Sequence, residues 1–292
     1  AARCRKFASM AAMSADRTSW LRWVRVAGLI RCSRHKARIM TRIALAQMCS
    51  GIDPVANAAS LESAIAEAAR GGAAMLFTPE MSGLVDGNRD RASKVWKRES
   101  EDVVVARVRQ AAKDHGIWVA IGSVAVLRDD GDRLANRALV IDANGDVRAR
   151  YEKIHLFDVD LATGESWRES ATYAPGDSVV VVDTPIGAYG PSICYDVRFP
   201  ALFNAMSAAG ANVIGAPAAF TVPTGQAHWH VLHRARAIEN ACFMVSAAQC
   251  GQHEDGRVTY GHSLVIDPWG EVLLDMGTGN GVGFADISIA DV

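Results

Sequence analysis

One stretch of the sequence joins a strand of small residues to a turn and to the start of a helix: Gly190-Pro191-Ser192-Ile193-Cys194-Tyr195-Asp196-Val197-Arg198-Phe199-Pro200. This order predicts that the Cys194 thiol lies on a sharp bend, with a free backbone N–H directly behind it. Covalent acyl-transfer enzymes need that arrangement, because the sulfur attacks a carbonyl carbon whose oxygen must then be stabilised. A lone cysteine in a strand more often packs in a core, so this interpretation requires an activating base and cation elsewhere in the chain.

Strands and helices alternate in the first half of the chain, and hairpins dominate the second half. Periodicity and Gly or Pro boundaries predict helices over residues 54–70, 99–115, 201–209 and 227–240. The predicted strands are 42–48, 73–78, 117–126, 136–141, 147–153, 178–183, 186–194, 212–216, 242–248, 261–266, 271–274 and 283–287. Residues 154–177 predict an irregular functional loop. We therefore expect one α/β domain in which two mixed sheets are sandwiched by helices.

The composition is typical of a soluble globular chain. Of its 292 residues, 50% are hydrophobic, and no run reaches the roughly 18 apolar residues of a membrane span. The net charge of -1 conceals a basic segment, residues 1–39, whose only acid is Asp16. The rest of the chain is acidic and would repel phosphates, which argues against nucleic-acid binding. Six cysteines without a CxxC pair favour a reducing, cytoplasmic location.

The basic segment is interpreted separately from the main domain, which we place at residues 40–292. Residues 1–39 show no regular apolar period, and Met40 resembles a natural start. We expect this segment to be a leader outside the fold, either disordered or non-native. An organelle-targeting peptide and a basic arm that binds nucleic acid are the alternatives.

Glu80, Lys153 and Cys194 lie at the ends of predicted strands, where reactive groups of α/β folds gather. A free thiol has a pKa of about 8.5 and needs assistance to attack at neutral pH. Glu80 is the candidate base, provided that a dry pocket raises the pKa of its carboxyl group toward neutrality. Lys153 and the backbone N–H of Tyr195 are the candidate groups for stabilising a tetrahedral oxyanion.

Three motifs resemble those of the nitrilase, or carbon–nitrogen hydrolase, superfamily in order and spacing. They are residues 77–81 (Phe-Thr-Pro-Glu-Met), 151–159 (Tyr-Glu-Lys-Ile-His-Leu-Phe-Asp-Val) and 193–200 (Ile-Cys-Tyr-Asp-Val-Arg-Phe-Pro). Further runs resemble the deaminated glutathione amidase branch, namely 234–239, 247–251 and 260–263. The resemblance covers residues 41–289. Two other runs, 227–229 and 267–270, are shared with the ω-amidases and do not separate the two branches.

The resemblance implies a four-layer α-β-β-α sandwich and a catalytic triad of Glu80, Lys153 and Cys194. It also implies a second glutamate sixteen residues after the lysine, which corresponds to Glu169. Glu165 is the nearby rival, but the residues that follow favour Glu169. A carboxylate there is expected to position the lysine and keep it protonated.

The activity implied by the resemblance is cleavage of an α-keto acid amide to a carboxylate and ammonia, without a metal or cofactor. Arg198 is the candidate clamp for a substrate carboxylate, and pairing with Asp196 or another acid is its alternative role. Phe220 and Thr224 correspond to a loop that lines the pocket in related enzymes. The family also implies a homodimer or larger homo-oligomer. Relatives continue beyond Val292, so either the natural tail is short or the chain is clipped.

Several alternatives stay open. The same triad serves nitrilases, ω-amidases and N-carbamoyl hydrolases, and the fold also suits a non-catalytic binding protein. His155 and His262 suggest a papain-like Cys–His dyad, which the Glu–Lys pair makes the lesser interpretation. His228, His230 and His233 suggest a metal site, but on a helix the first two point about 200° apart, so we expect none.

The remaining signals are structural. Residues 277–283 are Gly-rich but lack the strand and helix that flank a phosphate-binding loop, so a hairpin or connecting loop is expected. Cys242 and Cys250 are expected to be buried packing residues. We expect a small-molecule amide as the substrate, and no nucleic-acid or membrane partner.

Overall fold

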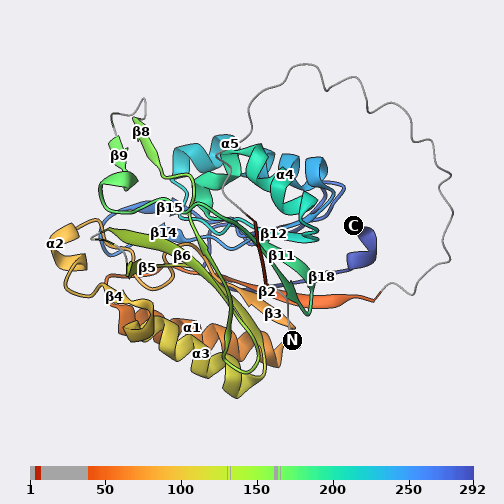
Figure 1. Ribbon diagram of the computed structural model, residues 1–292, viewed down its shortest axis with the longest axis horizontal. Helices are drawn as coiled ribbons and strands as arrows, with labels where there is room; N and C mark the ends of the chain where they lie inside the picture. Colours follow the sequence, from red (N-terminus) through yellow and green to blue (C-terminus); the bar gives the residue numbers. More distant parts are fainter. Residues whose placement is uncertain (1–3, 8–38, 130, 132, 161–163, 165) are drawn as a thin grey trace.

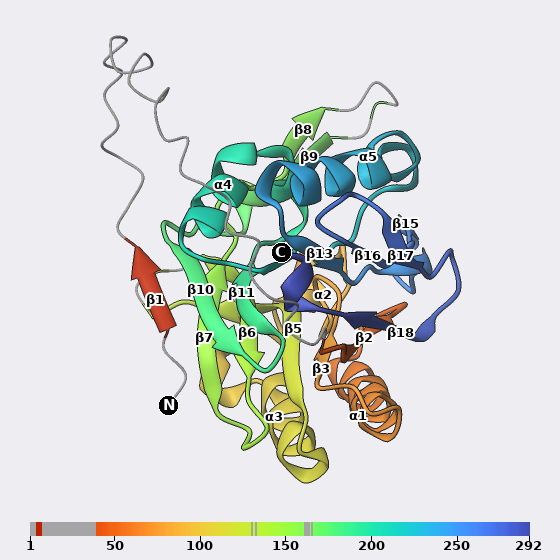
Figure 2. The same ribbon diagram turned by 90° about the vertical axis from the view of Figure 1, so that its right-hand side faces the viewer.

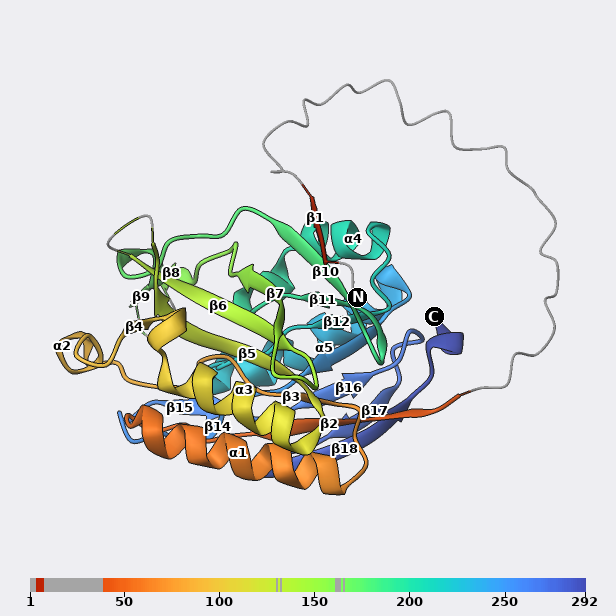
Figure 3. The same cartoon turned by 60° about the horizontal axis from the view of Figure 1, so that its bottom comes forward.

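The computed structural model describes residues 4–7, 39–129, 131, 133–160, 164 and 166–292 (Figure 1). Two β-sheets pack face to face, and a pair of helices covers the outer face of each sheet (Figures 1 and 3). The four layers confirm the α-β-β-α sandwich implied by the resemblance.

The first sheet has the order β18-β2-β3-β5-β6-β7, with β4 also paired to β5. Its strands are β2 (Thr41–Gln47), β3 (Met75–Phe77), β4 (Lys97–Arg98), β5 (Trp118–Leu127), β6 (Leu134–Ile141), β7 (Val147–Glu152) and β18 (Gly281–Ile287). The central strands β2, β3 and β5 are parallel. Parallel neighbours need crossover connections, which α1 (Pro54–Arg70) and α3 (Val103–His115) provide on one outer face.

The second sheet has the order β1-β10-β11-β12-β13-β16-β17, and its central strands β11, β12 and β13 are parallel. Its strands are β1 (Cys4–Phe7), β10 (Val179–Thr184), β11 (Gly187–Pro191), β12 (Val213–Gly215), β13 (Phe243–Ser246), β16 (Leu264–Ile266) and β17 (Val272–Asp275). Helices α4 (Pro200–Ala208) and α5 (Val222–Asn240) cross over between the central strands and cover this sheet (Figure 2).

Alternating side chains of β2 show why the sheets stack in this way. Ile43 and Leu45 join the core between the two sheets, whereas Ala44 and Ala46 join the core beneath α1 and α3. Successive side chains of a strand point to opposite faces, so a strand with a run of consecutive apolar residues, such as 43–46, must be covered on both sides there. Each fully buried Ile or Leu contributes about 1.5–3 kcal/mol relative to exposure.

The sequence prediction missed several short elements. The segment expected to be irregular, 154–177, contains the hairpin β8 (Asp158–Asp160) and β9 (Ser166–Arg168) and a 3-10 turn at Glu169–Ala171. The other unpredicted elements are α2 (Arg89–Ala92), β4, and the hairpin β14 (Cys250–Gln252) and β15 (Val258–Tyr260). Elements of two to four residues are too short to show a period in hydrophobicity. Helix α5 also begins earlier than predicted, at Val222 rather than at residue 227.

The terminal segments are described only in part. Within the predicted leader, residues 4–7 form β1, which pairs antiparallel with the edge strand β10 (Figure 2), and Ile39 precedes β2. The other residues of the leader lie outside the described residues. Across the described part of the chain, no helix has both the length and the apolar character needed to cross a membrane.

The candidate residues follow the ends of strands from both sheets. Lys153 directly follows β7, and Glu80 and Cys194 come three residues after β3 and β11. Gly122 in β5 packs against the backbone that leads to Glu80. A β-carbon at Gly122 would lie 2.1 Å from the carbonyl oxygen of Thr78 and 2.5 Å from the carbonyl carbon of Pro79. A glycine in a strand is required where another backbone approaches this closely.

Replacing Gly122 by alanine is expected to push the 78–80 segment away from β5. We expect Gly122→Ala to lower the free energy of unfolding by about 1–3 kcal/mol, the usual cost of overpacking, and to reduce turnover by displacing Glu80. Urea denaturation and steady-state kinetics measure the two effects. Gly279→Ala is the matched control, because a β-carbon at Gly279 meets nothing within 4 Å. Equal stability and activity of the two variants would contradict the proposed contact.

Candidate active site

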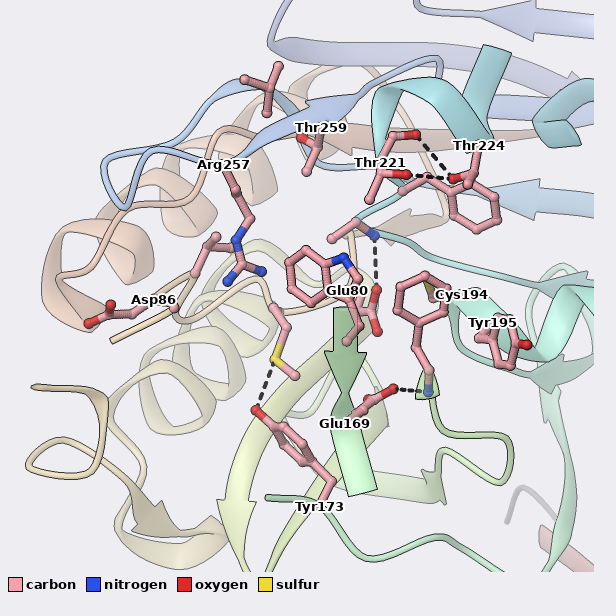
Figure 4. Close-up of a pocket in the computed structure, with 18 of the residues that line it drawn as sticks. Glu80, Asp86, Glu169, Tyr173, Cys194, Tyr195, Thr221, Thr224, Arg257 and Thr259 are labelled. Carbon is pink, nitrogen blue, oxygen red and sulfur yellow. Dashed lines mark hydrogen bonds between the residues drawn. The ribbon is translucent and has the colours of Figure 1, made fainter. Parts of the chain in front are cut away.

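Four of the predicted residues converge between the two sheets (Figure 4). The Nζ atom of Lys153 lies 2.9 Å from Oε1 of Glu80 and 2.9 Å from Oε2 of Glu169. The Cys194 thiol lies close enough to Glu80 for each group to shift the pKa of the other. Lys153 is only 2% exposed and Glu80 5%, so this is a buried ionic cluster rather than a surface ion pair. Glu165, the rival of Glu169, lies outside the described residues.

Burial and pairing determine the charges in this cluster. Burial disfavours the ammonium of Lys153, but the attraction of Glu80 and Glu169 outweighs it and raises the pKa of Lys153 well above its ordinary value. Burial, together with the nearby Glu80 carboxylate, raises the pKa of the Cys194 thiol well above its ordinary value. The cluster at rest therefore holds a protonated lysine and a neutral thiol.

The expectation for Glu80 was wrong in direction. Burial alone would raise the pKa of its carboxyl group, as predicted. The Lys153 ammonium, the neighbouring thiol and the backbone N–H of Ala219 together outweigh burial, however, so the pKa of Glu80 lies below its ordinary value. Glu80 is therefore already ionised and able to accept a proton, but it does not take the thiol proton at rest.

Two further groups fix the Glu80 carboxylate. The backbone N–H of Ala219 donates to Oε2 of Glu80 over 2.9 Å. The amide Nδ2 of Asn136 donates to Oε1 of Glu80 over 3.0 Å and to Oε1 of Glu169 over 3.1 Å. Asn136 thus bridges both glutamates. Sequence reasoning missed it because an asparagine inside a strand forms no recognisable motif.

The predicted bend at Cys194 is present. The Cys194 backbone has a φ of 50°, in the left-handed region that residues with a β-carbon avoid, and it begins a 3-10 turn spanning Cys194–Arg198. The N–H of Cys194 donates to the carbonyl of Pro217 over 2.9 Å. Such strain persists only where the surroundings enforce it. The bend places Tyr195, the candidate source of an oxyanion-binding N–H, directly after the thiol.

Asp196 connects the nucleophile turn to the lysine loop. Its buried carboxylate accepts hydrogen bonds from the Tyr151 hydroxyl at 2.6 Å, from the N–H of Ile193 at 2.9 Å and from the N–H of His155 at 3.0 Å. These bonds hold Cys194 and Lys153 in register. The Asp196 carboxylate is occupied by these partners rather than by Arg198, so the proposed Arg198–Asp196 pair is not formed.

Arg198 lies at the pocket wall. Its Nη2 atom is 3.3 Å from Nδ1 of His228, and its guanidinium carbon lies 5.9 Å from the ring centre of Tyr195 and 5.7 Å from that of Phe220. Thr224 lines the same cavity, but in the first turn of α5 rather than on a loop. The cavity has a volume of about 600 Å³, a size typical of small-molecule sites.

Neither candidate dyad histidine is paired with the thiol. Nδ1 of His155 lies 2.7 Å from Oδ1 of Asp196, and its ring stacks on Phe199. Nδ1 of His262 lies 2.9 Å from Oδ1 of Asp275. The structure therefore favours activation of Cys194 by Glu80.

The three histidines considered as a metal site are not brought together. Instead, His230, His262 and Asp275 bring three possible ligand atoms within 4.8 Å of one another. His262 and Asp275 are distant in sequence from α5, so helical spacing alone does not predict this group. These three residues do not line the cavity, and their atoms already hydrogen-bond to one another.

The expectations for the Gly-rich run 277–283 and for two of the cysteines are confirmed. Gly277 and Gly279 lie in the turn between β17 and β18, and both carbonyls accept hydrogen bonds from the side chain of Gln47. Cys242 and Cys250 are buried free cysteines. Two residues that sequence reasoning missed, Trp167 and Arg257, line the cavity. Both belong to hairpins that were not predicted.

Known proteins resemble this chain in sequence and in overall fold. The family described as "Carbon-nitrogen hydrolase" matches residues 42–292. A deaminated glutathione amidase from Yersinia enterocolitica is 41% identical over 233 residues, which cover 79% of this chain and 81% of that protein. The crystal structure of the Caenorhabditis elegans NitFhit protein has a TM-score of 0.80 and 36% identity. The match covers 88% of this chain and 62% of NitFhit, so the chain spans less than two thirds of that protein.

The structure of another amidase has been solved with a molecule bound covalently to its active site cysteine. A mutant amidase from Nesterenkonia sp. AN1 is described with acrylamide added at its active site cysteine. It has a TM-score of 0.74 and 29% identity, over 85% of this chain and 93% of that chain. Its overall fold is thus similar to the fold that carries Cys194 here.

We expect Asp196→Asn to weaken both folding and activity. The variant keeps the volume of the side chain but loses one acceptor oxygen and the negative charge. Some of the donors that bond to the Asp196 carboxylate therefore face an amide N–H group instead. The expected cost is about 2 kcal/mol of unfolding free energy, together with a fall in kcat as the two loops separate. Denaturation and turnover measurements check this, with Asp183→Asn on the exposed side of β10 as the control. Wild-type behaviour of Asp196→Asn would show that the carboxylate does not join the loops.

The charged state of Glu80 predicts a pH-dependent contribution to stability. Its pKa is lower in the folded than in the unfolded chain, where the ordinary value is 4.5. The stabilisation is therefore fully present above that value and is lost as pH falls through the folded pKa. Unfolding free energies from pH 3 to pH 7 should show a steeper acid loss for the wild type than for Glu80→Gln. Glu67→Gln, on the exposed face of α1, should retain the steep loss; parallel curves for all three proteins would refute the assignment.

Proposed function

The chain belongs to the carbon–nitrogen hydrolase family, and on this premise we propose that it hydrolyses an amide of the deaminated glutathione type through a thioester at Cys194. The observation that carries the proposal is the buried cluster in which Lys153 joins Glu80 to Glu169 beside the thiol. The relatives described as deaminated glutathione amidases support the substrate class. An intact cluster of charged groups also argues against a purely binding role.

Attack on the amide begins with a proton transfer. The Cys194 thiol gives its proton to the Glu80 carboxylate while the sulfur bonds to the amide carbon, and the carbonyl electron pair moves to oxygen. Negative charge thereby moves from Glu80 to the oxyanion, while the charge of the whole cluster is unchanged. The Lys153 ammonium and the backbone N–H of Tyr195 stabilise the oxyanion. Coupling the two events avoids a free thiolate, which the raised thiol pKa disfavours.

The second half returns the cluster to its starting state. The oxyanion collapses, the C–N bond breaks, and protonated Glu80 gives its proton to the departing nitrogen. Water then attacks the thioester while Glu80 accepts one of its protons. The C–S bond breaks, Glu80 returns that proton to the sulfur, and the acid product loses its own proton to solvent and leaves as a carboxylate. Glu169 and Asn136 act by positioning, because they hold Lys153 and Glu80 rather than the reacting atoms.

The proposed substrate changes the leaving group expected from the sequence. Glutathione joins its glutamyl side-chain carbonyl to the nitrogen of cysteine, and removal of its amino group leaves that amide intact. Hydrolysis at this carbonyl releases a dipeptide amine, not ammonia. The cavity of about 600 Å³ has room for more than a primary amide. Arg198, between Tyr195 and Phe220, is the proposed partner of the carboxylate on the acyl side.

The decisive test combines kinetics with intact mass. Cys194→Ala should lower turnover of deaminated glutathione by at least about 10⁴-fold while the variant remains folded, since no nucleophile is left. The wild type should show a mass increase equal to the acyl group when it is quenched during turnover. Cys242→Ala removes a buried cysteine outside the site and should keep its kcat. Sustained turnover by Cys194→Ala, or a wild type without any adduct, would overturn the mechanism.

The same assay separates the alternative reactions. Deaminated glutathione, α-ketoglutaramate, aliphatic nitriles and N-carbamoyl amino acids are compared by kcat/KM. We expect the highest value for deaminated glutathione, with release of the dipeptide followed by mass spectrometry. A higher value for a nitrile or a carbamoyl amino acid would reassign the activity within the family.

A further inference from the structure

Cations lie on both sides of the nucleophile in the cavity. Arg198 lies against the ring of Tyr195, and Tyr195 lies on one side of Cys194 and Glu80 (Figure 4). Arg257 and Asp86 lie on the opposite side of these two residues (Figure 4). Arg198 is already assigned to the acyl part of the substrate. Arg257 has no role in the mechanism described above.

Three segments of the chain hold Arg257 in one position. Its Nε atom donates to Oδ2 of Asp255 over 2.9 Å, and the same carboxylate accepts the N–H of Gly87 over 2.7 Å. The guanidinium carbon lies 5.6 Å from the ring centre of Trp167, which comes from the β8–β9 hairpin. The turn before β15 is itself anchored, because the buried His253 bonds to the carbonyl of Ser50. A side chain fixed in this way loses little further freedom when it binds a ligand.

The outer part of this guanidinium is available for a ligand. Among the residues that the structure describes, only Asp255 pairs with Arg257, and it does so through Nε. The neighbouring Asp86 is occupied by Arg91, at 2.7 and 2.8 Å. With its side chain 28% exposed, Arg257 is accessible from the cavity but partly shielded from water. The two terminal nitrogens of an arginine match the two oxygens of a carboxylate.

Other cations of the cavity fit this role less well. Arg168 is bound by both oxygens of Asp160 and its side chain is 51% exposed. Arg89 lies on the short helix α2 and is exposed. Charges in water are screened and contribute little to binding. Arg257 is therefore the strongest anion-binding group on the side opposite Arg198.

We propose that Arg257 binds the terminal carboxylate of a peptide leaving group, so that the cavity recognises an anion on each side of the scissile amide. This inference rests on the proposed amidase function and specifies its substrate: an amide whose departing amine carries a free carboxylate. Arg257 is a specificity residue and takes no part in the bond changes. Primary amides, whose leaving group is ammonia, do not use it.

Ligand binding to protein that cannot turn over tests the subsite directly. In the Cys194→Ala background, calorimetry compares deaminated glutathione with the same molecule amidated at its C-terminal carboxylate. We expect the free acid to bind about 10–100-fold more tightly, the range for a charge-assisted hydrogen bond. Adding Arg257→Met should remove this difference, whereas adding the matched control Arg168→Met should preserve it. Equal affinities for the two ligands before Arg257 is changed would overturn the proposal.

Turnover separates this inference from the proposed function. Arg257→Met alone should raise KM for deaminated glutathione about 10–100-fold and leave kcat/KM for α-ketoglutaramate within about twofold. A similar fall in kcat/KM for both substrates would mean that Arg257 only supports the fold. The proposed subsite would then be refuted, while the proposed amidase function would stand. If the wild type hydrolyses neither amide, the proposed function fails, and the calorimetry still decides the subsite. Should Arg257→Met not fold, Arg257→Lys replaces it, with a smaller but still selective loss expected.

Discussion

A single ammonium group buried between two carboxylates is the interaction on which the candidate site depends. Lys153 comes from the end of β7, Glu80 follows β3, and Glu169 begins the 3-10 turn after β9. Removing Lys153 would leave two carboxylates without a counter-charge in a dry site, which typically costs several kcal/mol. The fold must therefore bring three separate segments to within hydrogen-bond distance. Ion pairs on the surface of the chain, in contrast, contribute little to its stability.

Long elements and co-ordered motifs could be predicted from the sequence. Helix α1 carries a Pro start, a Gly end and an apolar face, and β2 has the apolar run 43–46 at its centre, so local chemistry determines both. The triad residues could be placed because each stands at the end of such an element. The direction in which the pKa of Glu80 shifts could not be predicted, because it depends on whether burial or the nearby lysine has the larger effect. That balance follows only from the 2.9 Å distance between the two groups.

Residues that depend on tertiary contacts escaped prediction. Asn136 lies in the middle of β6, where its bridging of two glutamates is visible only once the sheets are assembled. Arg257 and Trp167 lie on two hairpins that are distant in sequence and meet at the cavity. Their strands have only three residues each, which is too short for a periodic signal. Short elements that are stabilised by their neighbours rather than by their own pattern thus carry much of the substrate-facing surface.

The left-handed backbone at Cys194 has a consequence for how this protein can change over time. A residue with a β-carbon costs about 1–2 kcal/mol in that conformation, whereas glycine adopts it freely. Glycine at this position would therefore relax the turn at the expense of the thiol. At this residue the backbone conformation thus favours glycine, whereas the chemistry requires cysteine. A lineage released from the need for hydrolysis would gain stability by abandoning its nucleophile first, and would retain the sandwich as an inert scaffold.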